Sequence, residues 1–140
     1  MAANLGHQAF HLMRKLIQEH TALWQSEATE LTKPQFSVLL AISEKPGLEQ
    51  AELMAASVST KATLAEILGR MEKRGWILRE AGTTDKRRKF VYLTEAGCAL
   101  LQQAKVSAEL VDNQFVSRLS EADQQTFIRL LNEMLSKSGS

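Results

Sequence analysis

Four basic residues in a row, Lys86, Arg87, Arg88 and Lys89, stand directly after the polar segment Gly82-Thr83-Thr84-Asp85. Closely spaced lysine and arginine side chains present many positive hydrogen-bond donors over a short length of chain. The acceptor that matches such a row is a series of phosphates, as in the backbone of a nucleic acid. The chemistry that this stretch predicts is therefore phosphate binding.

The positive charge of the chain is concentrated around this run. Residues 61–89 hold nine basic and four acidic side chains, whereas residues 1–60 hold four and six, and residues 90–140 also hold four and six. The formal net charge of +1 hides this distribution. A local excess of this size is the electrostatic pattern of a nucleic-acid-binding protein, although the charged and solvated end of a helix would give a similar pattern.

The elements that must position the basic run are a helix and two strands. A helix with its apolar positions at Leu64, Ile67, Leu68 and Met71 leads to Gly75, and the apolar runs 76–78 and 90–93 flank the polar tip. We call residues 77–93 the wing, because helix, strand, basic turn and strand in this order are typical of a winged helix-turn-helix. The predicted fold class is mainly α with a small β-ribbon. A wing of this kind usually touches the phosphates and the minor groove of DNA.

A second helix-turn-helix signal precedes the wing. Thr32 and Gln35 have capping-box spacing at a predicted helix start, with Pro34 in the first turn, and Pro46-Gly47 ends that helix. We expect a short helix over residues 48–57 with Leu53 and Met54 facing inward. Ser59 is expected to cap the next helix. Two short helices joined by about three residues have the spacing of a DNA-reading pair.

Long helices with apolar stripes flank this central part. The spacing of apolar residues predicts one helix over residues 5–29 and two more within residues 95–137, beginning at Thr94 and at Ser120. A monomer of 140 residues would struggle to cover all of these stripes, so we expect them to form a homodimer. A two-fold dimer would present two recognition helices to a palindromic site. The whole chain, 1–140, is expected to be one domain, with its winged helix-turn-helix at residues 32–94.

Composition sets the remaining limits. The longest apolar runs are far shorter than the ~18 residues of a membrane span, the first ten residues do not resemble a secretory signal, and Cys98 is the single cysteine. A cytoplasmic protein without membrane contact is expected. Neither a phosphate-binding glycine loop nor a nucleophile–base arrangement is recognisable, and the last of three histidines is His20. We expect no enzymatic activity, no bound metal and no cofactor.

Several segments together resemble the MarR family of bacterial transcription regulators over nearly the whole chain. They are Leu53 within AELMAAS, the run 71–79 (MEKRGWILR), and Asp85-Lys86-Arg87 followed by Val91-Tyr92-Leu93-Thr94-Glu95-Ala96-Gly97. The resemblance implies an obligate homodimer with one winged helix-turn-helix in each subunit. It also implies repression of a neighbouring operon and release from DNA on binding a small ligand, often an aromatic acid.

The expected DNA contacts lie in two places. Hydroxyls and a lysine at the start of the recognition helix can meet phosphates and base edges, and Arg70 lies further along; these residues are Ser59, Thr60, Lys61, Thr63 and Arg70. Glu66 is either a base contact or, as we favour, a solvated charge. In the wing, Arg87 resembles the arginine of the family that enters the minor groove. Asp85 resembles the carboxylate that orients this arginine, or serves as a plain turn residue; Lys86, Arg88 and Lys89 are expected phosphate contacts.

A candidate effector site lies on the first helix. His7, His11 and Arg14 are spaced by four and three residues and so share one side, where an aromatic carboxylate could pair with the guanidinium and stack on the rings. Trp24 and Phe36 could supply apolar walls. The alternative is a polar stripe that faces solvent. His20 is expected instead to be a packed and hydrogen-bonded histidine.

Other functions remain open at this point. The same fold could contact a protein partner, although such modules usually lose the basic wing. A thiol-based redox sensor would use Cys98, but a structural role for this cysteine is favoured because the chain contains no resolving partner. Activation instead of repression would also suit this architecture.

Overall fold

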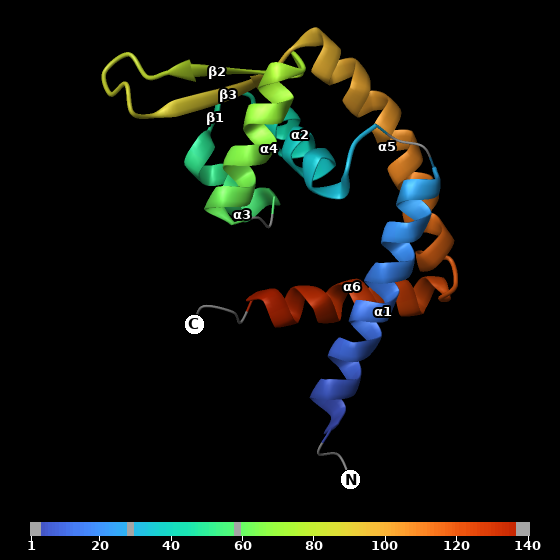
Figure 1. Cartoon of the computed structure of the whole chain (residues 1–140). Coiled ribbons are helices and arrows are strands. Elements are labelled where there is room, and N and C mark those ends of the chain that lie inside the picture. Colours follow the sequence, from blue (N-terminus) through green and yellow to red (C-terminus); the bar gives the residue numbers. More distant parts are fainter. Residues whose placement is uncertain (1–3, 28–29, 58–59, 137–140) are drawn as a thin grey trace. The chain divides into compact units, whose positions relative to one another are not determined.

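The computed structural model describes residues 4–27, 30–57 and 60–136. The chain divides into two compact units, which Figure 1 shows in their sequence colours. We call residues 28–107 the central unit, and residues 1–27 with 108–140 the terminal unit. The described chain is mainly helical with one small antiparallel sheet, so the predicted fold class is confirmed.

The central unit contains the helix-turn-helix and the wing. Its elements are α2 (Lys33–Glu44), β1 (Leu48–Glu49), the 3-10 turn η2 (Gln50–Glu52), α3 (Leu53–Ser57), α4 (Lys61–Lys73), β2 (Ile77–Ala81), β3 (Lys89–Leu93) and the first part of α5 (Glu95–Val116). The capping box that begins α2 is present: Gln35 N donates to Thr32 Oγ1 at 3.2 Å, and Thr32 N donates to Gln35 Oε1 at 3.0 Å. The wing of the sequence analysis consists of β2, β3 and the turn that joins them (Figure 1).

The sheet has three strands in the order β1-β3-β2, where the sequence pattern predicted only the two-stranded ribbon. In the β2–β3 hairpin Ile77 lies opposite Leu93 and Ala81 opposite Lys89. On the other edge of β3, Glu49 lies opposite Phe90 and Leu48 opposite Val91. The return strand of the wing is therefore paired on both sides.

The prediction of one helix over residues 48–57 is wrong in its first half, because that half pairs with the sheet. The N–H of Gly47 donates to the carbonyl oxygen of Val91 at 3.1 Å, and this bond brings the following residues beside β3. The helix proper begins only at Leu53, which is fully buried. Met54 is 37% exposed, so its predicted inward orientation is also wrong.

One apolar core organises the central unit. It gathers buried side chains from every helix and from all three strands: Leu31, Val38, Leu39, Ile42, Leu48, Leu53, Leu64, Leu68, Met71, Trp76, Ile77, Val91, Leu101 and Ala104. The apolar face of α4 packs into this core, and the same face was visible in the spacing of its residues. Burial of that face fixes which side of α4 remains exposed.

Two glycines set the junctions of the wing. Gly75 ends α4 with a φ of 80°, and the bonds from Trp76 N to Met71 O (2.9 Å) and from Gly75 N to Glu72 O (3.0 Å) form a Schellman motif. Gly97 lies where the start of α5 meets the hairpin. A Cβ on Gly97 would lie 2.1 Å from the carbonyl oxygen of Trp76, so no larger residue fits without a shift of the backbone.

The terminal unit consists of α1 (Leu5–Ser26), the end of α5 and α6 (Glu121–Ser136). Helix α6 begins with the predicted cap, in which Asp123 N donates to Ser120 Oγ at 3.1 Å. Trp24, Ala108 and Val111 are buried in this unit. His20 is packed and hydrogen-bonded as expected: its Nε2 lies 2.7 Å from Asp112 Oδ1, and its ring is tilted against Phe115.

Much apolar surface of the terminal unit is exposed to solvent in the single chain. The large side chains that are at least 37% exposed there are Leu5, Phe10, Leu12, Leu16, Ile17, Leu110, Val116, Leu119, Phe127, Ile128, Leu130, Met134 and Leu135. Their helices therefore carry apolar faces that the single chain leaves uncovered. None of the helices that the structure describes is both long and apolar enough to cross a membrane.

Candidate nucleic-acid interface

The first turn of α4 exposes polar side chains on a well-capped helix start. Thr60 is the N-cap, and its Oγ1 accepts from Thr63 N at 3.2 Å. Ser59, predicted to be the cap and a DNA contact, lies outside the described residues, and the capping role belongs to Thr60. Because Leu64 is buried, Lys61 and Thr63 are left on the solvent side. The unpaired amides at this end add a positive partial charge.

Further along the exposed face of α4, Arg70 is paired within the helix. Its Nη2 lies 3.1 Å from Oε1 of Glu66, one turn earlier, and both side chains are more than 60% exposed. Glu66 is thus a surface charge with an intrahelical partner. An exposed pair of this kind is easily exchanged for an outside partner, since it contributes about 0.3–0.5 kcal/mol.

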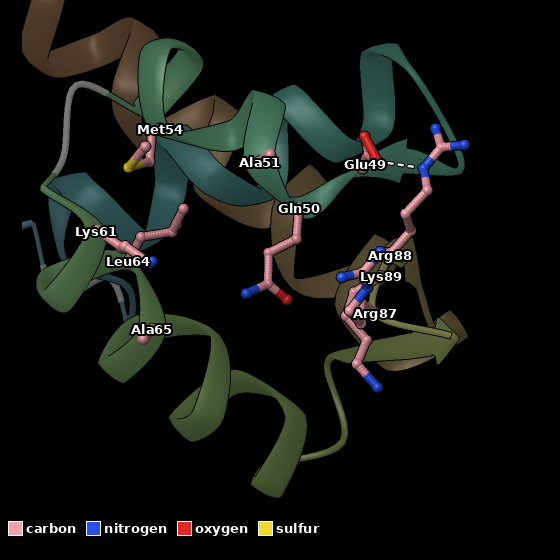
Figure 2. A pocket seen from close by; sticks show the side chains of 10 residues that line it. All are labelled: Glu49, Gln50, Ala51, Met54, Lys61, Leu64, Ala65, Arg87, Arg88 and Lys89. Carbon is pink, nitrogen blue, oxygen red and sulfur yellow. Dashed lines mark hydrogen bonds and ion pairs between the residues drawn. The ribbon is translucent and has the colours of Figure 1, made fainter. Parts of the chain in front are cut away.

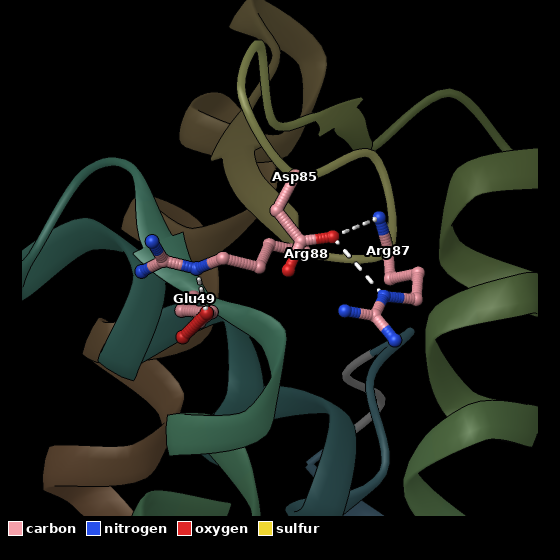
Figure 3. A network of polar contacts seen from close by, with 4 residues as sticks. All are labelled: Glu49, Asp85, Arg87 and Arg88. Atoms are coloured by element: carbon pink, nitrogen blue, oxygen red, sulfur yellow. Dashed lines mark hydrogen bonds and ion pairs between the residues drawn. The ribbon is translucent and has the colours of Figure 1, made fainter.

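The turn of the wing is organised by Asp85. Gly82 N donates to Arg88 O at 2.9 Å, and Arg88 N donates to Asp85 O at 3.2 Å. The Asp85 carboxylate accepts from Arg87 twice, from its backbone N at 3.0 Å and from its Nε at 3.2 Å (Figure 3). The side-chain bond from Arg87, and then its backbone bond, lower the pKa of Asp85 below its ordinary value. The carboxylate therefore serves the turn and orients the arginine at once.

Arg87 is the most exposed of these groups, with 92% of its side chain accessible. The aspartate holds the guanidinium at the tip of the wing but covers almost none of it. The remaining donors of a guanidinium fixed in this way are free to bind a phosphate or a base edge.

The neighbouring Arg88 is less exposed than Arg87 and binds a different carboxylate. Its Nε donates to Oε1 of Glu49 in β1 at 2.5 Å, and its guanidinium carbon lies 5.2 Å from the centre of the Phe90 ring. The bond to Glu49 is the main cause of the raised pKa of Arg88. In Figure 3 the two consecutive arginines turn to different carboxylates, Arg88 to Glu49 and Arg87 to Asp85.

A groove of about 440 Å³ brings the two predicted contact regions together (Figure 2). It is lined by Lys61, Leu64 and Ala65 of α4, by Arg87, Arg88 and Lys89 of the wing, and by Glu49, Gln50, Ala51 and Met54. Lys61 and the consecutive residues Arg87, Arg88 and Lys89, which follow it by more than 20 positions, therefore line one groove. Thr63 and Arg70 line a smaller groove between α4 and the start of α2, and Lys86 is exposed in the turn.

The sequence analysis did not predict the third wall of the groove, which η2 and its neighbours supply. Gln50 extends into the groove (Figure 2), and its Oε1 accepts from Arg79 Nη1 at 3.3 Å. Arg79 in turn binds Glu72 of α4 through Nη2 at 2.7 Å, and this bond is the main cause of the lowered pKa of Glu72. No charge or motif marked Gln50 in the sequence, because its place depends on the pairing of β1 with β3.

Two of the residues proposed for an effector site share a concavity within the terminal unit. The rings of His7 and His11 are stacked, with centroids 6.5 Å apart, and His11 and Arg14 line a shallow concavity on α1. Trp24 is buried ten residues beyond Arg14, which corresponds to ~15 Å along a helix. Phe36 belongs to the central unit, where it packs against the core. Cys98 is exposed in the first turn of α5, whereas a structural cysteine was expected.

Comparison with known proteins agrees with this geometry. A sequence model of the MarR family matches residues 31–89. The chain is 50% identical to the transcriptional regulator HosA of Escherichia coli over 131 residues, which span 94% of this chain and 97% of HosA. It is 32% identical to the transcriptional repressor NicR of Pseudomonas putida over 130 residues, 91% of this chain and 82% of NicR.

A solved structure shows the same fold. BpsR of Bordetella bronchiseptica, whose DNA binding is regulated by 6-hydroxynicotinic acid, superposes with a TM-score of 0.84 at 27% identity, covering 91% of this chain and 92% of BpsR. The family match covers the helix-turn-helix and most of the wing, and the likeness to HosA extends over both units. The chain therefore belongs to the MarR family of transcriptional regulators, with a winged-helix DNA-binding fold.

Proposed function

We propose that this protein binds a palindromic operator in double-stranded DNA as a homodimer. In this proposal it acts in the cytoplasm as a repressor and leaves the DNA when a small aromatic carboxylate binds. The groove between α4 and the wing carries the proposal, because Lys61, Arg87 and Lys89 converge there from two distant segments. Cations in this arrangement suit a phosphate backbone, and the exposed Arg87 at the tip suits the minor groove.

The contacts divide by position within the central unit. Thr60, Lys61 and Thr63 at the start of α4 would meet phosphates and base edges in the major groove, and Arg70 lies about two to three turns further along. Lys86 and Lys89 would neutralise phosphates beside Arg87. Ser59 would belong with the first set.

The homodimer is supported by the exposed apolar side chains of the terminal unit. Five of them lie on α6 alone: Phe127, Ile128, Leu130, Met134 and Leu135. A soluble monomer rarely exposes so much contiguous apolar surface, and a second copy of the chain would cover it symmetrically.

Release by an aromatic carboxylate is supported by chemistry and by relatives. Arg14 and His11 share one concavity on α1 and offer a guanidinium and a ring to such a ligand. NicR is described as a repressor, and BpsR responds to a hydroxylated pyridine carboxylic acid. These two relatives support the proposal of a repressor with an aromatic acid effector.

The direct experiment is selection of a DNA duplex from a random pool by the full chain, followed by fluorescence-anisotropy titration at several salt concentrations. We expect an enriched palindrome with half-sites about 10 base pairs apart, and an affinity that falls steeply with salt. Failure to enrich any sequence, or an affinity independent of salt, would instead favour a protein partner for this winged helix.

A further inference from the structure

The ion pair between Arg88 and Glu49 joins the wing to the body of the central unit. In the sheet Glu49 lies opposite Phe90, and Arg88 comes two residues before Phe90, directly ahead of the first residue of β3. From this position the long Arg88 side chain reaches Glu49 on the neighbouring strand. The arginine lies along the Phe90 ring and ends on the carboxylate.

This carboxylate is largely buried for an acid. The Glu49 side chain is 23% exposed and that of Arg88 is 53% exposed, whereas Arg87 is 92% exposed. An acid on the wall of a groove proposed to receive DNA repels phosphate. Its presence there therefore suggests another role. Its short bond to Arg88 supplies that role, because a fixed carboxylate can hold the turn end of the wing (Figure 3).

A second bridge acts on the other strand of the wing. Arg79 of β2 binds both Gln50 of η2 and Glu72 of α4. Two arginines of the wing therefore bind the segment 49–50, Arg88 from directly before β3 and Arg79 from β2. Since β1 itself has only two residues, these side chains add to the apolar core that joins the wing to the helix-turn-helix.

We infer that Arg88 is a positioning residue: through Glu49 it sets the angle of the wing, so that Arg87 can reach DNA. The inference rests on the proposed DNA binding and deepens it. It gives Arg88 a role different from the phosphate contact expected from the basic run. Two consecutive arginines then have separate functions, one toward DNA and one toward the protein.

The direction in which Glu49→Gln changes the DNA affinity tests this inference. Removing an acid from a DNA-facing groove should strengthen DNA binding if Glu49 has only an electrostatic influence. If Glu49 holds the wing through Arg88, Glu49→Gln should weaken binding, by about two- to five-fold for a partly exposed pair. The measurement is anisotropy titration of the full chain against the duplex that the wild-type protein selects. Unchanged or tighter binding by Glu49→Gln overturns the inference.

A matched control and a double variant separate positioning from general effects of charge. Glu80→Gln removes an exposed acid from β2 and should leave the affinity unchanged or raise it slightly. In a chain that already carries Arg88→Gln, the further change Glu49→Gln should no longer weaken binding, because the two residues act as one unit. Equal weakening by Glu49→Gln with and without Arg88 would contradict the proposed pairing.

An NMR measurement on the DNA-free protein distinguishes loss of the ion pair from poor folding of the variant. In the NMR spectrum of the free protein, the Nε–H signal of Arg88 should shift and exchange faster with water in Glu49→Gln, while the amide signals of the core remain in place. An unchanged Arg88 signal overturns the inference even if DNA affinity falls. If the wild-type protein selects no duplex, the proposed function fails together with the inference. If the wild-type protein selects a duplex but Glu49→Gln binds it unchanged or more tightly, the inference alone fails.

Discussion

Asp85 accepts two hydrogen bonds from Arg87, one from the backbone N and one from Nε, so a single carboxylate fixes both the turn of the wing and its arginine. The arginine remains 92% exposed in this arrangement. An ordered but exposed guanidinium loses less conformational freedom on binding than a mobile one. The wing therefore presents its proposed DNA contact already oriented.

The first prediction concerns the titration of Asp85. Its pKa is lowered chiefly by Arg87, so the stabilisation from this pair is present above the unfolded value of about 3.9 and is lost as the pH falls through the folded value. We expect Arg87→Ala to raise the midpoint of the Asp85 carboxyl titration followed by NMR. Because this pKa is lowered, Asp85 should contribute nothing to the pH dependence of stability between about pH 5 and 8. An identical midpoint in both proteins would show that the pair does not form in solution.

The second prediction concerns the two glycines of α4 and α5. Gly97→Ala should destabilise the fold by about 1–3 kcal/mol, because the new Cβ would collide with the backbone of Trp76. Gly69→Ala is the matched control, since Gly69 lies in the middle of α4 with open space around it, and alanine there should stabilise by up to ~1 kcal/mol. Urea unfolding of both variants checks the signs. A stabilised Gly97→Ala protein would contradict the close packing of α5 on the hairpin.

The third prediction concerns association through the apolar terminal helices. Ile128→Glu together with Leu135→Glu places two charges on the exposed stripe of α6 and should shift the protein from dimer to monomer in sedimentation velocity. Gln125→Glu adds a charge on the same helix at an already polar position and should leave the dimer intact. A dimer that survives the double change would exclude this stripe from the interface.

The fourth prediction concerns the effector. Arg14→Ala and His11→Ala should each weaken the binding of aromatic carboxylates in calorimetric titration, by about ten-fold or more for the lost guanidinium pair. Arg129→Ala removes an exposed charge from α6, outside this concavity, and serves as the control. If both substitutions leave the affinity unaltered, the effector binds elsewhere.

The fold was predictable where local chemistry decides it. The capping box at Thr32 and Gln35, the apolar face of α4 and the turn before β3 all depend on residues close together in the chain. The third strand was not predictable in this way. Leu48 and Glu49 are extended because they pair with residues more than 40 positions away, and no periodicity exists in two residues.

In the candidate site too, the sequence predicted what local residues determine and missed what distant strand pairing determines. The basic residues Lys61 and Arg87 to Lys89 were identified from composition and resemblance, and the structure brings them to one groove. Gln50 and Glu49 were missed because their positions in this groove are created by the sheet. Arg88 looked equivalent to Arg87 in the sequence, and only the pairing of β1 with β3 reveals its acidic partner.

Arg87 at the tip of the wing is the residue proposed to engage DNA most directly. Arg87→Ala should weaken binding to the selected duplex by about 1–3 kcal/mol in anisotropy titrations, with a shallower dependence on salt. Lys45→Ala removes one positive charge from the same unit outside the groove and should change the affinity little. An affinity of Arg87→Ala equal to that of the wild-type protein would contradict the account.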